Sequence, residues 1–220
     1  MKKTVRLVLS LVFYCMTGIG ISFTIKAEIG VSSFNSLNVA LANVLHSKVG
    51  MVTAILNGLF LVSYMLLTKM KHPVRYFMQA VAVVCLGSVI DFFTYEAFGD
   101  LRVSGYFVQL LVFVLGTTIA GISTGMVLNL QSMVFPIEGA CTKLAERMGA
   151  PFSRVRYGVD VLSVSGSLLL SLLFGLPLLV REGTVISLFL LTAAINLTKK
   201  TFEKACSNKA KRQESQMPEE

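Results

Sequence analysis

The stretch Leu7–Ile25, LVLSLVFYCMTGIGISFTI, decides the fold class, because it is long and apolar enough to cross the hydrocarbon core of a bilayer as one helix. Lys2, Lys3 and Arg6 precede it, as basic residues precede the core of a signal peptide. The run is longer than such a core, however, and no Ala-x-Ala cleavage site follows it. We therefore interpret it as a retained transmembrane helix.

Five further apolar stretches predict five further crossings. The six predicted spans lie at about 5–25, 50–68, 76–95, 105–128, 157–180 and 183–198. The chain is 54% hydrophobic and only 15% charged, which excludes a water-facing surface of ordinary extent. Because the runs are continuous rather than alternating, they predict helices and not barrel strands. We expect an all-α polytopic membrane protein with one membrane domain over 1–198 and a cytoplasmic tail over 199–220.

Lysine and arginine are unevenly distributed between the connections, and this predicts the orientation. With the N-terminus inside and six crossings, the outer side holds only Lys26, Lys48, Arg102 and Arg181, which leaves 16 of the 20 basic residues inside. The positive-inside rule therefore places both termini in the cytoplasm. The net charge of +8 reflects this topology and not nucleic-acid binding, because no basic patch is interleaved with stacking aromatics.

An internal repeat organises the chain. A polar break at 26–33 and a short amphipathic segment at 34–46 follow the first span, and the same plan recurs at 129–135 and 136–148 after the fourth. A shift of 103 residues superposes the two halves, about 5–97 and 104–198. It pairs Asn35 with Glu138, and Asn57 with Asp160.

Each half holds three crossings, so the second half must enter the membrane from the opposite side to the first. The sequence thus predicts two inverted three-helix repeats, an architecture typical of secondary transporters, whose binding site lies between the halves.

The short amphipathic segments have two interpretations. Ser33 suits the cap of the first, while Pro136 and Glu138 suit the first turn of the second. They can be interfacial helices that lie flat on the membrane surface. Alternatively they are re-entrant half-helices whose N-termini point into a cavity and favour an anionic ligand.

A resemblance to a known family supports the fold. The stretch 22–38, SFTIKAEIGVSSFNSLN, is similar to the motif "ikAdlGiSPwdaLn" of the YczE/YyaS/YitT family of bacterial six-helix membrane proteins, and above all to its YczE branch. In the second half, Pro136–Gly139, Arg154 with Arg156, and the stretch 183–196 add to the resemblance, which covers about residues 10–198.

The departures from the motif concern one point of the chain. Ser33 and Phe34 replace the usual Pro-Trp, and Asn35 replaces the usual Asp, which weakens any proposal that needs a titrating acid there. The resemblance implies a bacterial plasma-membrane protein from a family in which some members are proposed exporters or permeases. It implies no catalytic mechanism.

Polar side chains inside or beside the spans are the candidate site residues, because an ionised carboxylate near the centre of a membrane helix costs about 3 kcal/mol. Asp160 can pair with Arg156 at i,i+4 spacing and anchor a helix end, or it can act as a proton- or cation-linked ligand. Asp91 lies near the outer interface, where anchoring is the simpler interpretation. The candidate ligand-binding residues are Asn35, Asn38, Asn57, Glu138 and Asp160.

A second group of candidates lies at the helix breaks. Lys26 and Glu28 can snorkel at the membrane edge or take part in gating or ligand contact. Asn129 and Gln131 occupy the matching break of the other half and carry the same two interpretations.

Enzyme signatures are absent from the sequence. The two histidines, His46 and His72, fall at predicted membrane surfaces, and no HExxH, paired-carboxylate, nucleophile-elbow or P-loop pattern occurs. The spacing of the four cysteines matches no metal site, so we expect no metal, no cofactor and no disulfide. Gly121 and Gly125 form a GxxxG pattern, which favours close helix packing within the chain or a homodimer.

We therefore expect a small-molecule permease or exporter, in which the lipid bilayer and a small-molecule substrate are the partners. The alternative is a non-transporting accessory or scaffold protein that acts through helix contacts. A transporter requires a polar, water-accessible crevice between the halves, whereas a scaffold is expected to have a dry centre and an exposed seam of small residues.

Overall fold

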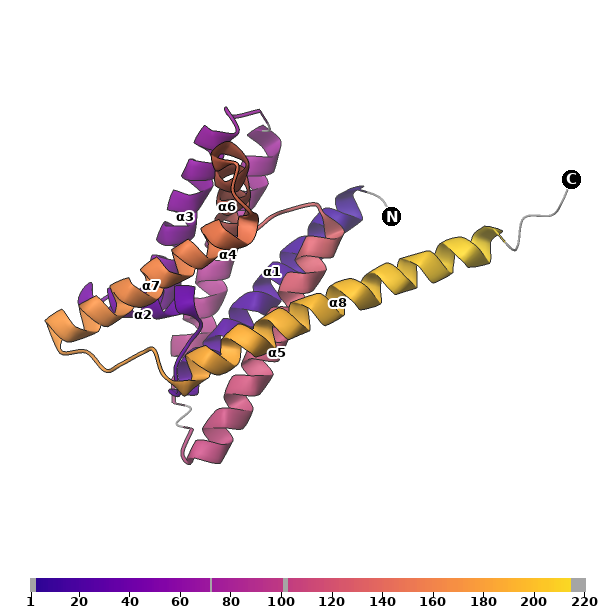
Figure 1. Cartoon of the computed structure of the whole chain (residues 1–220). Helices are drawn as coiled ribbons and strands as arrows, with labels where there is room; N and C mark the ends of the chain where they lie inside the picture. Colours follow the sequence, from indigo (N-terminus) through magenta and orange to yellow (C-terminus); the bar gives the residue numbers. More distant parts are fainter. Residues whose placement is uncertain (1–2, 72, 101–102, 215–220) are drawn as a thin grey trace, which may run out of the picture.

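The computed structural model describes residues 3–71, 73–100 and 103–214. Within these residues the chain is entirely helical (Figure 1), and the elements are α1 (Lys3–Lys26), α2 (Ser33–Val44), α3 (Val49–Leu67), α4 (Pro73–Asp91), the π-helical turn η1 (Phe92–Ala97), α5 (Tyr106–Leu130), α6 (Pro136–Met148), α7 (Phe152–Phe174) and α8 (Glu182–Glu214). The predictions that concern Lys2, His72, Arg102 and 215–220 lie outside the described residues.

Six helices of the described chain are long and apolar enough to span a membrane: α1, α3, α4 continued by η1, α5, α7 and α8. This confirms the predicted number of spans. The fifth span differs from its predicted position at 157–180, because α7 begins at Phe152 and ends at Phe174. Gly175 follows in the left-handed conformation, with φ of +62°, and Pro177 comes two residues later. Both residues stop a helix, although the chain stays apolar beyond them.

The last helix extends further than its predicted end near 198. α8 continues to Glu214, so most of the predicted tail is a helical extension of the sixth span. The stretch 199–214 is rich in Lys, Glu and Ala and holds neither Pro nor Gly, a composition that favours helix.

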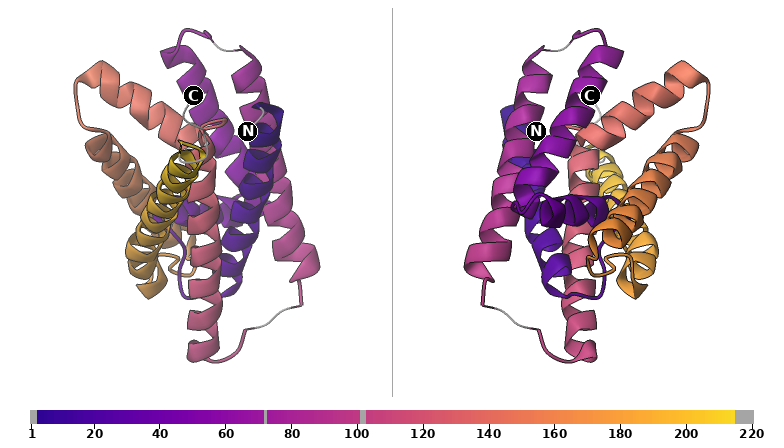
Figure 2. Two further views of the ribbon diagram at one scale, coloured as in Figure 1. Left: turned by 90° about the vertical axis from the view of Figure 1, so that its right-hand side faces the viewer. Right: turned by 90° about the vertical axis from the view of Figure 1, so that its left-hand side faces the viewer.

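Helices α1 and α5 cross at the centre of the bundle and run in opposite directions (Figure 2). Gly20 and Gly116 form the crossing point, because a Cβ atom on Gly20 would lie 2.6 Å from the Gly116 carbonyl oxygen and 2.7 Å from the Ala120 nitrogen. The GxxxG pair Gly121 and Gly125 packs against α8 of the same chain, at Ala194 and Thr198. Small residues therefore allow both helix pairs to approach closely.

The two short helices are embedded in the bundle. α2 packs on α3 and α7, and α6 packs on the same two long helices. Six residues of each short helix are buried, among them Asn38 in α2 and Cys141 in α6. Ser32, rather than the predicted Ser33, is the residue that precedes the first turn of α2.

The helix starts of the two halves keep a constant spacing. Lys3 and Tyr106, Ser33 and Pro136, and Val49 and Phe152 begin corresponding helices, and each pair is 103 residues apart. The halves differ at their last helices. α3 and α4 pack as a hairpin, whereas α7 and α8 separate from their shared connection (Figure 1).

The glycine crossing generates a stability prediction. We expect Gly20→Ala to lower the melting temperature, because the overpacking cost of about 1–3 kcal/mol exceeds the gain of about 1 kcal/mol that alanine brings to a helix interior. Gly58 in α3 is the matched control, since a Cβ atom added there would have no neighbour within 4 Å. Gly58→Ala should leave the melting temperature unchanged or raise it, as followed by circular dichroism in detergent. Equal shifts for both variants would contradict the prediction.

Candidate functional site

The predicted ligand-binding residues fall into two polar clusters at equivalent places in the two halves. The neutral cluster, on α2 and α3, consists of Asn35, Asn38, Thr53 and Asn57. The charged cluster, on α6 and α7, consists of Glu138, Cys141, Arg156 and Asp160. Each member of one cluster is 103 residues from a member of the other, so the duplication extends to the polar residues of the interior.

The neutral cluster is held by amide hydrogen bonds. Asn38 donates from Nδ2 to Thr53 Oγ1 over 3.0 Å, which joins α2 to α3. Asn57 donates from Nδ2 to the Thr53 carbonyl oxygen over 2.9 Å. Asn38 is fully buried, yet its Oδ1 accepts no hydrogen bond in the described residues. Asn35 lies half-buried on the same short helix. A buried amide oxygen without a donor is costly, and it marks a place where a donor can be accepted.

The charged cluster contains an ion pair. Arg156 Nη1 donates to Asp160 Oδ1 over 2.7 Å within α7, as the i,i+4 spacing predicts. About a quarter or less of either side chain is exposed. The pair occupies the place that the Asn57–Thr53 bond occupies in the other half. Asp160 therefore anchors the first turns of α7 rather than presenting an unpaired carboxylate.

Glu138 is the unpaired acid of the charged cluster. Its residue is half-buried, but its Oε2 atom is out of contact with solvent and has no hydrogen-bond partner in the described chain. Burial raises the pKa of the Glu138 carboxyl, the Arg156 charge and a hydrogen bond from its own backbone N–H lower it in part, and the Asp160 charge raises it. Burial also raises the pKa of the Cys141 thiol, one turn further along α6.

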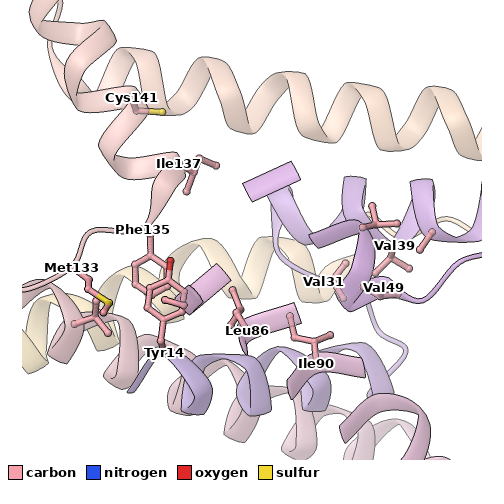
Figure 3. Close-up of a cluster of buried hydrophobic side chains, with 14 residues drawn as sticks. Tyr14, Val31, Val39, Val49, Leu86, Ile90, Met133, Phe135, Ile137 and Cys141 are labelled. Carbon is pink, nitrogen blue, oxygen red and sulfur yellow. The ribbon is translucent and has the colours of Figure 1, made fainter. Parts of the chain in front are cut away.

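Tyr14 faces this acid from the middle of α1. The Tyr14 ring stacks on Phe135, the residue before α6, with ring centroids 4.2 Å apart (Figure 3). Tyr14 is fully buried, and its hydroxyl likewise lacks a partner in the described chain. A charge on Glu138 would act electrostatically on the Tyr14 hydroxyl. Two buried polar atoms without hydrogen-bond partners among the described residues thus lie in the same region of the bundle.

The candidate gating residues lie elsewhere, at the two ends of the bundle. Lys26 Nζ donates to the Gly99 carbonyl oxygen over 3.1 Å, and the carbonyl oxygen of Glu28 accepts from Arg181 Nη1 over 3.0 Å. Asn129 is still part of α5 and donates to the Thr198 carbonyl oxygen over 3.4 Å. Gln131 follows α5 with a φ of +51° and is exposed. These four residues lie at or near helix ends, and none of them hydrogen-bonds with either polar cluster in the described residues.

Sequence reasoning passed over Thr53, Cys141 and Tyr14. The first two could have been found by applying the shift of 103 residues to every polar residue, because it maps Asn38 onto Cys141 and Thr53 onto Arg156. Tyr14 carries a hydroxyl in the middle of an apolar span, which is a weaker signal, because tyrosine is common near membrane interfaces.

One cavity of about 420 Å³ lies apart from both clusters. It is a groove between α5 and α8, and its lining includes Ile122, Met126, Leu197 and Phe202. The groove is almost wholly apolar, so it suits a lipid chain or a helix side chain better than a polar ligand.

The fold and its buried polar clusters define a six-span, all-helical membrane protein with an internal duplication of helix starts. The chain belongs to the family described as "Family of unknown function (DUF6198)", whose match covers residues 4–200. Neither a curated protein nor a solved structure matches the chain.

The Arg156–Asp160 pair generates a prediction about stability. We expect Asp160→Asn to cost about 1–3 kcal/mol, because it leaves the half-buried donors of the Arg156 guanidinium without their acceptor. The double variant with Arg156→Gln should cost less than the sum of the two single changes, by about 1 kcal/mol or more. Melting temperatures of the three variants measure this coupling.

Glu146→Gln is the control for this experiment, because it breaks the Lys143–Glu146 pair, whose acidic side chain is 58% exposed. We expect no measurable change from it. Strict additivity of the Arg156 and Asp160 variants would show that the buried pair contributes nothing.

Proposed function

We propose that the protein is a small-molecule permease or exporter that works by alternating access between two inverted halves. The observation that carries this proposal is the pair of polar clusters at equivalent interior positions, which contain buried polar atoms without partners among the described residues. A purely structural membrane bundle gains nothing from such groups, because unsatisfied polar atoms in an apolar interior cost free energy. A ligand that binds between the halves would satisfy them.

Three features support the inverted repeat. The first helices of the two halves, α1 and α5, run in opposite directions (Figure 2). Three corresponding helices start with a constant offset. Each short helix also packs on a long helix of the other half, α2 on α7 and α6 on α3. Reciprocal packing of this kind is expected when a pseudo-twofold axis relates two halves.

The charges support the predicted orientation. At one end of the bundle, Lys48 pairs with Glu96 over 3.9 Å and Arg181 contacts Glu182 over 3.4 Å, so the few basic residues there are balanced by acids. Most other basic residues belong to the opposite end or to the C-terminal part of α8. We assign that end to the cytoplasm by the positive-inside rule. The resemblance to the YczE branch favours a bacterial plasma membrane.

The alternative function, an accessory or scaffold protein, has one observation in its favour. α7 and α8 bury little of their surface within the chain and present large apolar side chains outward, such as Leu172 and Phe189. Together with the apolar groove between α5 and α8, these faces could bind another membrane protein. Lipid covers such faces equally well, so this observation has less weight than the polar clusters.

Cysteine accessibility separates the two functions. In a variant without the native cysteines, we expect Ser163→Cys to react with membrane-impermeant maleimides from both faces of sealed vesicles. Ser163 is 3% exposed and lies one turn beyond Asp160, so a reagent reaches it only when the halves open. A ligand from a small-molecule screen should raise the rate of maleimide labelling of Ser163→Cys from one face of the vesicle and lower it from the other.

Ser63→Cys is the matched control, because Ser63 is exposed on the outer side of α3 and should face lipid. It should react from neither face. If Ser163→Cys also stays unreactive from both faces under all conditions, the centre is permanently dry and the scaffold function takes precedence.

The screen itself is read as a rise in melting temperature. A ligand at about one hundred times its Kd should stabilise the protein by about 2.7 kcal/mol.

A further inference from the structure

We propose that Glu138 is the proton-binding site of this carrier, protonated while the start of α6 is packed beside Tyr14 of α1 and ionised when α6 moves away. The inference rests on the proposed function and assigns the coupling ion, which is a proton, to one residue. It is carried by the arrangement of Glu138, Tyr14 and the Arg156–Asp160 pair.

The first step is the lack of a partner. Oε2 of Glu138 and the hydroxyl of Tyr14 are both shielded from solvent, and neither makes a hydrogen bond with the described residues. An ionised carboxylate in that position needs several donors, whereas a protonated carboxyl is neutral and both donates and accepts. The packed arrangement therefore favours the protonated acid. A proton is also the one ligand that needs no cavity.

The second step is the charge balance around the acid. Arg156 is the cation that acts on Glu138, and it already donates to Asp160 over 2.7 Å. Two carboxyl groups thus share one guanidinium, and the second carboxyl has no counter-ion of its own among the described residues. The remaining titratable neighbours on packed elements are Tyr14 on α1, Cys141 on α6 and Tyr64, whose ring would lie 3.3 Å from a Cβ atom added to Gly139. None of these supplies a positive charge.

The third step explains why the acid can also ionise. Glu138 is the third residue of α6, where the unpaired N–H groups and the helix dipole favour a negative charge. Burial and the helix end therefore oppose each other, so a movement that admits water can change the protonation state. In that movement the Glu138 O–H bond breaks, the electron pair stays on the carboxylate, and the proton passes to water.

The direction of the pH effect follows from the raised pKa of the Glu138 carboxyl in the packed state. The packed state binds the proton more tightly than the open state, in which the carboxyl has an ordinary pKa. Packing of α6 is therefore fully favoured below that ordinary pKa, and it weakens as pH rises towards the raised value. Asn35 holds the equivalent place in the other half, so that place carries no titratable group there.

Cys141 is a native reporter of this movement, because it is three residues beyond Glu138 on α6 and 2% exposed. In the variant Cys15→Ser, Cys85→Ser, Cys206→Ser, the rate of Cys141 labelling by N-ethylmaleimide is measured from about pH 5 to about pH 8. Each rate is divided by that of the detergent-unfolded protein at the same pH, which removes the thiol's intrinsic pH dependence. We expect the normalised rate to rise about tenfold, with a one-proton midpoint above the ordinary carboxyl range.

Glu138→Gln should remove this pH dependence and hold the normalised rate at its low-pH value. Glu146→Gln is the matched control on the same helix, and it should retain the parent profile. A glutamine variant with an unchanged pH profile would overturn the proposal. If Glu138→Gln does not fold, Glu138→Asp replaces it, because it keeps a carboxyl at a different depth. If the midpoint of the Cys141 labelling profile then differs from that of the parent protein, the proposal is supported. If the midpoint is the same, the proposal is contradicted.

The proton site and the carrier function fail in different ways. If the Cys141 labelling rate of the protein with Glu138 does not change with pH while Ser163→Cys still reacts from both faces, the proton assignment is wrong and the carrier function stands. If the profile is flat and Ser163→Cys reacts from neither face, both are wrong.

Discussion

The structure depends on how two interrupted helices satisfy their backbone in an apolar interior. The breaks at 27–32 and 131–135 release carbonyl oxygens that a continuous helix would have bonded internally. Thr184 Oγ1 donates to the Val31 carbonyl oxygen and Gln79 Nε2 to that of Val134, each over 2.7 Å. Val31 and Val134 both lie two residues before a short helix. The last helix of each half thus closes the break of the other, and the two halves are interlocked.

This interlock explains where polarity is tolerated. Once the breaks are satisfied, α2 and α6 can enter the bundle and bring polar side chains inside with them. In the first half that polarity is neutral, since Asn38, Thr53 and Asn57 bond to one another. In the second half the same positions hold charge, and one acid has no counter-ion of its own among the described residues. Equivalent positions thus carry unequal chemistry, an amide network in one half and a titratable group in the other.

Much of this architecture can be predicted from sequence, because hydropathy, helix starts and an internal shift are local properties. Proline favours the first position of a helix, and α6 does begin at Pro136. The predicted end of the fifth span is wrong, because Leu176, Leu178 and Leu179 keep the window apolar after Gly175 has stopped the helix. The placement of Tyr14 against Phe135, beside the start of α6, could not be predicted, because it depends on the packing of segments more than a hundred residues apart.

The half that carries the charge is also the half with fewer restraints. In the first half, Asp91 Oδ1 accepts from Gly50 N over 2.6 Å and Tyr95 Oη from Val49 N over 3.2 Å, so α4 and η1 cap the start of α3. Close approach of Gly50 to Gly87 fixes the same hairpin. α7 and α8 separate and lack such a joint within the described residues. The proposed change of charge at Glu138 would therefore act on the half whose last two helices do not pack on each other, while α3 and α4 hold the first half as a hairpin.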